Sequence, residues 1–427
     1  MASSDLTSAL LELEDSSAAQ KSKGYNELLV QLAKSPASSA EQQGENLVVY
    51  IDSLMQSSLG IITIRPLLTN LIQLLASSSA EVKVRAGSHL TTVLQSQLPS
   101  FEEQDATARE ILADGYEAQE EWSQAAKALQ GIQLDSTQRT VSDTAKVQTW
   151  VRIVRYFLED DDTVSAETAL NKIKNSSTAA QVLQSSPDLQ LHYQLSQARI
   201  LDSRREFLNA SAEYLNVSFN GAVAEDDRLH ALSASIKTAI LAPAGPSRSR
   251  TLAKLYKDER SNDLEEYGIL ENMFLDRLLA PAEVEAFAAK LAPHQLATTA
   301  DGSTVLSKAV VEHNLLAASK IYENIYTSSL AGLLGLKDGK DDTAAEKAED
   351  YAARMVEQGR LKAQIDHIDG VITFESIPGV ELQGPTKDLR SWDYDVQGLV
   401  EDVEKCAAAI TEAFPVRSAF SHPLTSS

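Results

Sequence analysis

Residues 327–374 read TSSLAGLLGLKDGKDDTAAEKAEDYAARMVEQGRLKAQIDHIDGVITF, and the hydrophobic periodicity changes within this stretch. Apolar residues first recur at helical spacing, whereas apolar and polar residues alternate from Leu361 onward. Asp369 and Gly370 form a dipeptide typical of a tight hairpin turn, and residues 371–374 continue the alternation after it. The stretch therefore predicts a helix, a second helix and a two-stranded β-hairpin, which is the plan of a winged helix.

Both predicted helices carry recognisable end signals. Thr327 lies at the start of the first helix, and Thr343 with Glu346 forms a capping box at the start of the second. Gly359 follows the apolar stripe of the second helix, at a position where glycine commonly ends a helix. The loop that connects the helices, residues 337–343, is polar and rich in aspartate.

A winged helix can bind nucleic acid or protein, and the charge of its second helix indicates which of the two it binds. The second predicted helix carries four carboxylates against two basic side chains over residues 343–357, and the chain has a formal net charge of −23. Phosphate contacts dominate affinity for nucleic acid, so a helix that enters a DNA groove should be basic. We therefore expect protein association, in which a neighbouring hairpin extends the unpaired edge of this one. The residues expected to take part are Ile365, Ile368, Val371, Ile372 and Phe374.

Upstream of this region, the chain consists of amphipathic helical segments. Small and large apolar residues recur at helical spacing in residues 25–98, 108–129, 147–158, 166–173, 192–201 and 207–215. A single helical pair of this kind cannot bury its apolar face, so neighbouring pairs should stack. The pattern predicts a tetratricopeptide-like helical-repeat solenoid, with a generic helical bundle as the alternative. The expected fold class is therefore all-α with a small β-hairpin.

The two ends of the chain differ from this helical body. Residues 1–20 are rich in serine and are expected to be disordered, as is the tail at residues 415–427. Proline and glycine mark a linker at residues 377–387, after which residues 388–414 predict one long helix. Because this helix has no domain of its own to pack on, it should fold back or join other chains. Its candidate interface residues are Leu399, Val400, Val403 and Ile410.

The sequence offers no catalytic, cofactor-binding or metal-binding constellation. Its seven histidines form neither a His-x-His pair nor a His-Glu-x-x-His motif, the spacings by which zinc enzymes bring ligands together. Asp366, His367 and Asp369 are close in sequence, but neighbours on a hairpin strand face opposite sides of the sheet. Cys406, the single cysteine, lies on the apolar stripe of the predicted C-terminal helix. We therefore expect no cofactor and no metal.

Composition points to a reducing compartment and to no membrane span. One cysteine excludes an intrachain disulfide, and the first residues lack the basic and apolar pattern of a secretory signal. The most apolar run, residues 59–75, is interrupted by Arg65, Pro66 and Asn70, so it is too broken to cross a bilayer. A protein of the cytoplasm and nucleus is expected, with no membrane among its partners.

Several separated motifs occur in order between residues 252 and 374. They are YKDER at 256–260, YGIL at 267–270, MFLDR at 273–277, PHQ at 293–295, EHNLL at 312–316, GRL at 359–361 and IDHIDG at 365–370. Together they resemble the PCI domain of the COP9 signalosome subunit 4 family. The resemblance implies a PCI domain over residues 252–376, with a helical part and a winged helix at about 327–375, preceded by a helical-repeat arm over residues 21–245. The loop at residues 337–343 departs from the family pattern, in which it is expected to be shorter.

The resemblance implies a function without catalysis. It points to a non-catalytic scaffold and substrate-sensing subunit of the COP9 signalosome, which removes NEDD8 from cullin–RING ubiquitin ligases through a zinc site on another subunit. The implied partners are the other PCI and MPN-domain subunits, a cullin and its RING-box partner, and no nucleic acid. The alternatives are a PCI subunit of the proteasome lid and, from another class, a winged-helix nucleic-acid-binding protein. The YKDER run and the TTADG run at residues 298–302 favour the signalosome.

Two segments acquire expected contacts from this resemblance. Residues 294–302 are small and polar, and they form a longer connection than two helices need. One interpretation is that the segment only connects the two helices and makes no functional contact. The family resemblance implies that the PCI domain abuts the pair of MPN-domain subunits that includes the peptidase. Thr298, Thr299 and Asp301 are therefore candidates for a regulatory contact. It also implies that the C-terminal helix joins a bundle formed by several subunits.

Overall fold

The computed structural model describes residues 4–14, 18–34, 39–136, 139–298, 302–336, 341–374, 399–400 and 403–407. The chain divides into a helical unit, Met1–Leu275 with Leu279–Ala309, and a wing unit, Asp276–Leu278 with Val310–Ser427. The predicted PCI domain spans both units. Its first helices, α14 (Pro246–Tyr256) and α15 (Tyr267–Phe274), pack on the preceding helices α12 (Phe207–Ser218) and α13 (Glu225–Leu241) and so belong to the helical unit.

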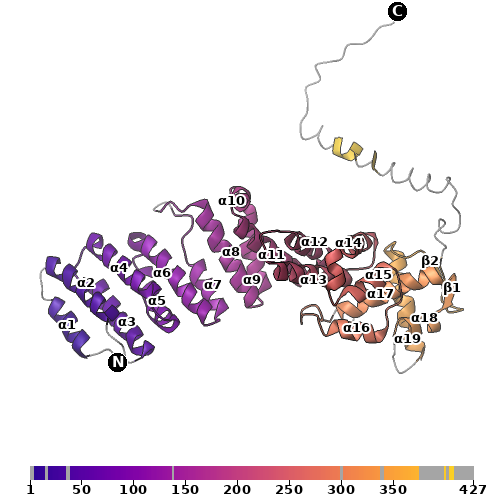
Figure 1. Ribbon diagram of the computed structural model, residues 1–427, viewed down its shortest axis with the longest axis horizontal. Coiled ribbons are helices and arrows are strands. Elements are labelled where there is room, and N and C mark those ends of the chain that lie inside the picture. The colour runs from indigo at the N-terminus through magenta and orange to yellow at the C-terminus, as the bar shows by residue number, and fades with distance from the viewer. Residues whose placement is uncertain are drawn as a thin grey trace, which may run out of the picture. The chain divides into compact units, whose positions relative to one another are not determined.

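The helical unit is built from helices most of which pack against near neighbours in the chain (Figure 1). They are α1 Ser4–Glu14, α2 Ala18–Lys34, α3 Ala40–Gln56, α4 Ile61–Ala76, α5 Ala80–Gln95, α6 Leu98–Ala118, α7 Trp122–Gln130, α8 Asp143–Glu159, α9 Thr163–Asn175, α10 Ala179–Ser185, α11 Pro187–Ser203, α12 Phe207–Ser218, α13 Glu225–Leu241, α14, the 3-10 helix η1 Glu259–Asp263, α15 and α16 Pro281–Ala288. Large side chains of α3, α4 and α5, among them Leu47, Leu68 and Leu90, are completely buried between these helices. Burial of such stripes is what holds a helical array together, since no single helix pair can cover its own apolar face.

The first residues differ from the expectation of disorder. Ser4–Glu14 forms α1, in which Leu6 and Leu10 are buried at 6% and 4% exposure in the same core as the α3 and α4 side chains. The two leucines are four positions apart, so they lie on one helix face. The serines that suggested disorder flank this stripe without interrupting it.

Three helical hairpins close with the same backbone turn. The second residue after the end of each first helix has a positive φ angle: Glu120 at 60°, Asp161 at 58° and Arg205 at 63°. The N–H of the following residue donates to a carbonyl five positions earlier, in the pairs Glu121–Tyr116 at 3.0 Å, Asp162–Phe157 at 2.9 Å and Glu206–Leu201 at 2.9 Å. This is the Schellman closure of a helix, and it ends the first helix of three successive helix–turn–helix pairs: α6–α7, α8–α9 and α11–α12.

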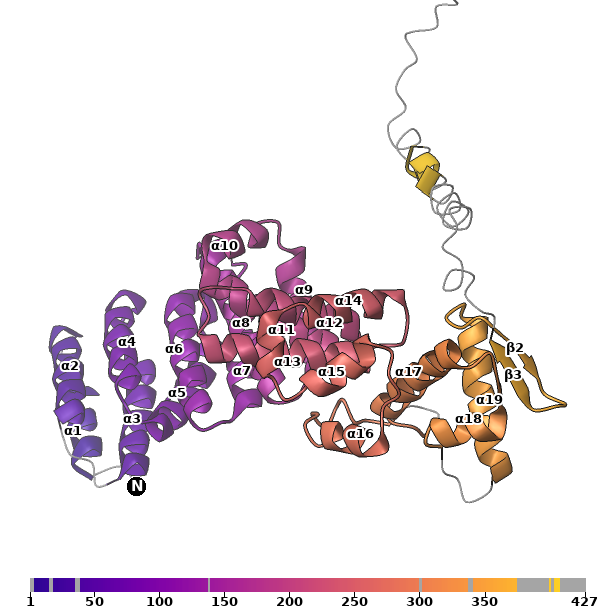
Figure 2. The same ribbon diagram turned by 45° about the vertical axis from the view of Figure 1, so that its right-hand side comes forward.

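The wing unit contains the predicted winged helix. Its elements are the greater part of α17 Val305–Ile321, then β1 Asn324–Tyr326, α18 Thr327–Leu333, α19 Asp341–Glu357, β2 Ala363–Asp366 and β3 Val371–Phe374. The strands form one antiparallel sheet in the order β1-β3-β2, so the hairpin is two of three strands. Figure 2 shows the β2–β3 hairpin projecting beside α19. These elements confirm the predicted fold class, with β1 as an addition to the predicted two strands.

Local signals place the boundaries of the second wing helix. α19 begins at Asp341, two residues before the predicted cap, and ends at Glu357. Gly359 follows it with a φ angle of 68°, and the N–H groups of Arg360 and Leu361 donate to the Met355 carbonyl at 2.9 and 3.1 Å. Glycine adopts this backbone conformation without strain, which is why the helix ends where the sequence predicts.

Near the C-terminus, the structure describes residues 399–400 and 403–407, which are helical. Leu399, Val400 and Val403 are exposed at 65%, 49% and 60%. The predicted interface residue Ile410, the linker at 377–387, the tail at 415–427 and most of the predicted helix at 388–414 lie outside the described residues. Within the described part of the chain, no helix is both long enough and apolar enough to cross a membrane.

Candidate protein-interaction sites

The wing sheet presents a free edge and an apolar tip. β3 pairs with β1 on one side and with β2 on the other, so within the described residues the outer edge of β2 has no strand partner. Unpaired N–H and C=O groups on such an edge can accept another strand. Ile368, at the turn between β2 and β3, is 95% exposed.

The five residues predicted for this interface occupy different environments. Ile372 and Phe374 are buried at 0% and 3% exposure and belong to the core of the wing, while Ile365 and Val371 are half-buried. Ile368 is the one member of the set that presents most of its side chain to solvent. A role of Ile372 or Phe374 in association would therefore be indirect, through the shape of the sheet.

The hairpin residues with metal-binding side chains make structural contacts. The Asp366 carboxylate accepts hydrogen bonds from the N–H groups of Ile368 and Asp369 at 3.0 and 3.1 Å, which shapes the turn. His367 Nδ1 lies 2.8 Å from a carboxylate oxygen of Glu349 on α19. Among the described residues, no group of three or more His, Cys, Asp or Glu side chains could hold a metal ion.

A bidentate ion pair fixes the base of the wing. Arg360, just after α19, donates from both terminal nitrogens to the Glu312 carboxylate on α17 at 2.6 and 2.8 Å. Glu312 is 2% exposed, so its charge depends on this partner. The adjacent His313 is also buried and lies 2.9 Å from the Arg277 carbonyl oxygen through Nε2. These contacts explain why the EHNLL and GRL motifs occur together, and they give His313 a structural role.

The predicted regulatory loop is attached to the arm where the loop begins. Asp202, near the end of α11, is 5% exposed, and its Oδ2 accepts hydrogen bonds from Gln295 Nε2 at 2.8 Å and His294 Nε2 at 3.1 Å. We call these three residues the Asp202 anchor. Gln295 also accepts, through Oε1, the N–H of Ala292 at 3.2 Å, so its amide is held at both ends.

Two further contacts hold the middle of this loop. The guanidinium of Arg205, in the turn after α11, donates to the Thr298 carbonyl at 3.4 Å. Thr298 also forms an isolated antiparallel bridge with Thr304, which closes the loop on itself. Of the three predicted regulatory residues, Thr298 belongs to this closure, whereas Thr299 and Asp301 lie outside the described residues.

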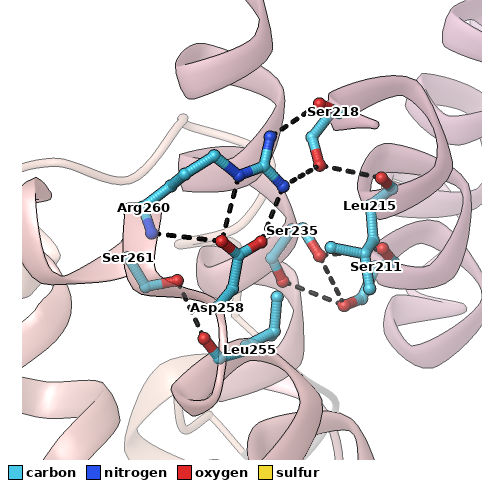
Figure 3. A network of polar contacts seen from close by, with 8 residues as sticks. All are labelled: Ser211, Leu215, Ser218, Ser235, Leu255, Asp258, Arg260 and Ser261. Carbon is cyan, nitrogen blue, oxygen red and sulfur yellow. Dashed lines mark hydrogen bonds and ion pairs between the residues drawn. The ribbon is translucent and has the colours of Figure 1, made fainter. Parts of the chain in front are cut away.

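A polar network joins the arm to the first PCI helices (Figure 3). The Asp258 carboxylate receives Arg260 Nε at 3.0 Å and Nη2 at 2.6 Å, and Arg260 Nη1 donates to the Ser218 carbonyl on α12 at 2.7 Å. Hydrogen bonds from Arg260 lower the pKa of Asp258. The guanidinium also lies over the Phe219 ring, 4.6 Å from its centroid.

Buried serines complete the same network. The hydroxyls of Ser211 and Ser235 each donate to the other residue's carbonyl, at 3.0 and 2.8 Å, and tie α12 to α13. Ser261 donates to the Leu255 carbonyl at 2.8 Å, which connects η1 to α14. Sequence analysis did not single out these serines, although serine at a buried position of an otherwise apolar stripe signals close helix contact.

The YKDER motif is therefore structural. Tyr256 stacks on Phe274 and on Tyr267 with ring centroids 4.5 and 5.9 Å apart, and Arg260 makes the ion pair described above. The stack accounts for the aromatic residues that the YGIL and MFLDR motifs contribute. Tyr256 therefore serves in packing, and Arg260 in ion pairing.

Comparison with known proteins identifies the family. A family model described as PSMD12/CSN4, N-terminal, matches residues 5–226, and the PCI domain model matches residues 270–376. A protein of Emericella nidulans named COP9 signalosome complex subunit 4 is 55% identical over 418 residues, covering 98% of this chain and 100% of that protein. Proteins of the same name from Neurospora crassa and Arabidopsis thaliana are 45% and 39% identical, over 97% and 82% of this chain and 98% and 86% of their own lengths. The chain belongs to the COP9 signalosome complex subunit 4 family.

Proposed function

We propose that this chain is a non-catalytic scaffold and substrate-sensing subunit of a COP9 signalosome, the complex that removes NEDD8 from cullin–RING ubiquitin ligases. The observation that carries the proposal is the identity of 55% over the whole length of a relative that bears the subunit 4 name. This name favours the signalosome over the proteasome lid. The charge of α19, with its excess of carboxylates, speaks against the nucleic-acid alternative.

Two surfaces support assembly with other subunits. The free edge of β2 can be extended by a strand from a neighbouring PCI domain, and Ile368 would add apolar contact at its end. The exposed side chains Leu399, Val400 and Val403 would join a helical bundle of several subunits. Exposed apolar side chains in a row on one helix are typical of a surface that another helix covers.

Substrate sensing would involve the arm and the anchored loop. The arm is proposed to contact a cullin and its RING-box partner, and the loop at residues 298–301 to contact an MPN-domain subunit. The Asp202 anchor joins the end of α11 to the start of the longer loop at residues 294–302. This loop leads directly into α17. A displacement of α11 would thus reach the loop through short polar contacts. The cytoplasm and nucleus are the proposed location.

Purification of the tagged full-length chain from cells that express it tests this function. We expect MPN-domain and PCI subunits of the signalosome to co-elute with it in one assembly on gel filtration. Recovery with proteasome lid subunits instead would favour a PCI subunit of the proteasome lid. Recovery with nucleic acid but without protein subunits would favour a winged-helix nucleic-acid-binding protein. For the substituted chains described below, Lys254→Gln serves as the control, because Lys254 is exposed on α14.

A further inference from the structure

The connection between α12 and α13 contains the dipeptide Asn220–Gly221, the one place in the chain where a glycine follows an asparagine. In such a dipeptide, the main-chain nitrogen of the second residue can attack the side-chain carbonyl carbon of the first and close a cyclic imide. Glycine obstructs this attack least, because it has no Cβ. Two reacting groups held in one short segment react far faster than separate molecules do. The dipeptide therefore brings together the groups that a spontaneous modification requires.

The attacking nitrogen is free to react. Within the described residues, the Gly221 N–H has no hydrogen-bond partner. Its surroundings are fixed, because the Asn220 N–H donates to the Val217 carbonyl at 3.0 Å, and the Val223 N–H closes a turn on the Asn220 carbonyl at 3.2 Å. Gly221 is exposed, and a Cβ placed on it would meet no atom within 4 Å. The nitrogen can therefore approach its target without first breaking a hydrogen bond or displacing a side chain.

The attacked side chain is held by its oxygen alone. The N–H of Ala222 donates to Asn220 Oδ1 at 3.0 Å. When a nucleophile adds to Cγ, negative charge develops on this oxygen, and a donor that is already in place stabilises that charge. The leaving nitrogen, Nδ2, has no hydrogen-bond partner in the described part of the chain. The turn therefore polarises the carbonyl and leaves the departing group unrestrained.

A second exposed asparagine supplies an internal comparison. Asn175 is the last residue of α9 and is followed by Ser176, which is also small. The Ser176 N–H, however, donates to the Ile173 carbonyl at 3.1 Å, so the corresponding nitrogen is engaged. Among the described residues, no donor reaches the side-chain oxygen of Asn175. Asn175 therefore lacks both features that favour the reaction at Asn220.

We propose that Asn220 converts spontaneously to aspartate and isoaspartate. In the first step, a bond forms between the Gly221 nitrogen and Asn220 Cγ, and the bond from Cγ to Nδ2 breaks. The proton of the Gly221 N–H ends on the departing nitrogen, which leaves as ammonia, and a cyclic imide remains. In the second step, water opens the imide. Addition of water at Cγ gives aspartate, and addition at the main-chain carbonyl carbon gives isoaspartate.

The modified residue lies beside the polar network that joins the arm to the first PCI helices. The Ser218 carbonyl accepts a hydrogen bond from Arg260 at 2.7 Å, and the ring of Phe219 lies under the same guanidinium. Conversion to aspartate leaves the length of the main chain unchanged. Isoaspartate instead routes the main chain through the side chain and lengthens it, so the turn that leads into α13 must rearrange. This inference does not depend on the proposed signalosome function.

Incubation of the full-length chain tests the proposal, with peptide mass mapping and isoaspartyl methyltransferase labelling as readouts. We expect conversion at Asn220, faster in mildly alkaline than in mildly acidic buffer, because the attacking nitrogen must lose its proton. Asn175 should convert about tenfold or more slowly, which corresponds to a barrier ~1.4 kcal/mol higher. Because the turn polarises the carbonyl, the folded chain should react at least as fast as the chain in urea. Conversion at Asn220 in urea alone, or equal rates at both asparagines in the folded chain, would overturn the proposal.

A matched pair of glycine substitutions assigns the reaction to this turn. Gly221→Ala adds a methyl group that meets open space, and the φ angle of Gly221 is not positive, so the urea midpoint should be unchanged. The added Cβ crowds the attacking nitrogen, so conversion of Asn220 should slow about tenfold or more. Gly268→Ala, on α15, also adds a methyl group in open space and should leave the rate at Asn220 unchanged. If Gly221→Ala converted as fast as Gly268→Ala, the proposed attack by the Gly221 nitrogen would be contradicted.

Discussion

The side-chain amide of Gln295 donates to the Asp202 carboxylate at 2.8 Å, across 93 positions of the chain. Both residues are buried, at 6% and 5% exposure, so the contact is not exchanged freely for water. It fixes the start of the loop at residues 294–302 to the end of α11. The loop is thus an attached part of the arm, which is the arrangement that a sensing role would require.

Loss of this contact should alter regulation more than assembly. Gln295→Ala leaves Asp202 with fewer donors and frees the loop, and a coupling of about 1–3 kcal/mol corresponds to a roughly 5- to 150-fold change in equilibrium. We expect the reconstituted complex to assemble and its resting deneddylation rate to rise about fivefold or more. Replacement of residues 298–301 by glycine and serine should act in the same direction. Unchanged rates in an intact complex would make the loop an idle connector.

The wing offers a matched pair of substitutions. Ile372→Asp places a charge at a position with 0% exposure and should unfold the wing, at a cost of several kcal/mol, roughly 3 or more. Ile368→Asp changes a side chain with 95% exposure and should leave the fold intact while it weakens association with a neighbouring PCI subunit. Circular dichroism and gel filtration of both variants separate the two effects. If Ile368→Asp assembled as the unmodified chain does, the hairpin tip would be excluded as a contact.

The exposed stripe at residues 399–403 should serve assembly rather than folding. Leu399→Glu and Val403→Glu alter side chains that are 65% and 60% exposed, so the helical circular-dichroism signal of the chain should hardly change. The doubly substituted chain should nevertheless lose partner subunits on gel filtration, because a charge at a helix-bundle interface is buried without a partner. A cooperative loss of helix in the isolated chain would indicate instead that this segment packs on its own chain.

The Asp258–Arg260 pair should make stability depend on acidic pH. Hydrogen bonds from Arg260 hold the pKa of Asp258 below its ordinary value of 3.8. The stabilisation is therefore complete above pH 3.8 and is lost as the pH falls through the lowered pKa of the folded state. Asp258→Asn should cost about 1–3 kcal/mol at pH 7, measured as a lower urea midpoint, with a difference that shrinks below pH 3.8. A difference that grew in acid would contradict this assignment of the pair.

The wing helices and hairpin could be predicted because their signals are local. Gly359 marks a helix end within a few residues, and Asp369 with Gly370 marks a turn. The third strand, β1, has only three residues and pairs with a strand far along the chain, so no periodicity revealed it. The helix α1 was hidden by its serines, although Leu6 and Leu10 have helical spacing.

The contacts at the anchored loop could not be predicted for a different reason. Hydrogen bonds between Asp202 and the residues at 294 and 295 join positions 92 and 93 apart, and single-sequence patterns carry no information on such pairs. The sequence indicated that the loop was long and polar, and the resemblance supplied its expected role.

Deneddylation activity measured on two preparations tests the central claim, that this chain is a non-catalytic subunit of a COP9 signalosome. One preparation is the isolated full-length chain, and the other is the assembly purified from cells through the tagged chain. We expect the assembly to cleave a NEDD8–cullin conjugate, and the isolated chain to be inactive and free of stoichiometric zinc by elemental analysis. Cleavage by the isolated chain that a chelator abolishes, or an assembly without deneddylation activity, would contradict the account.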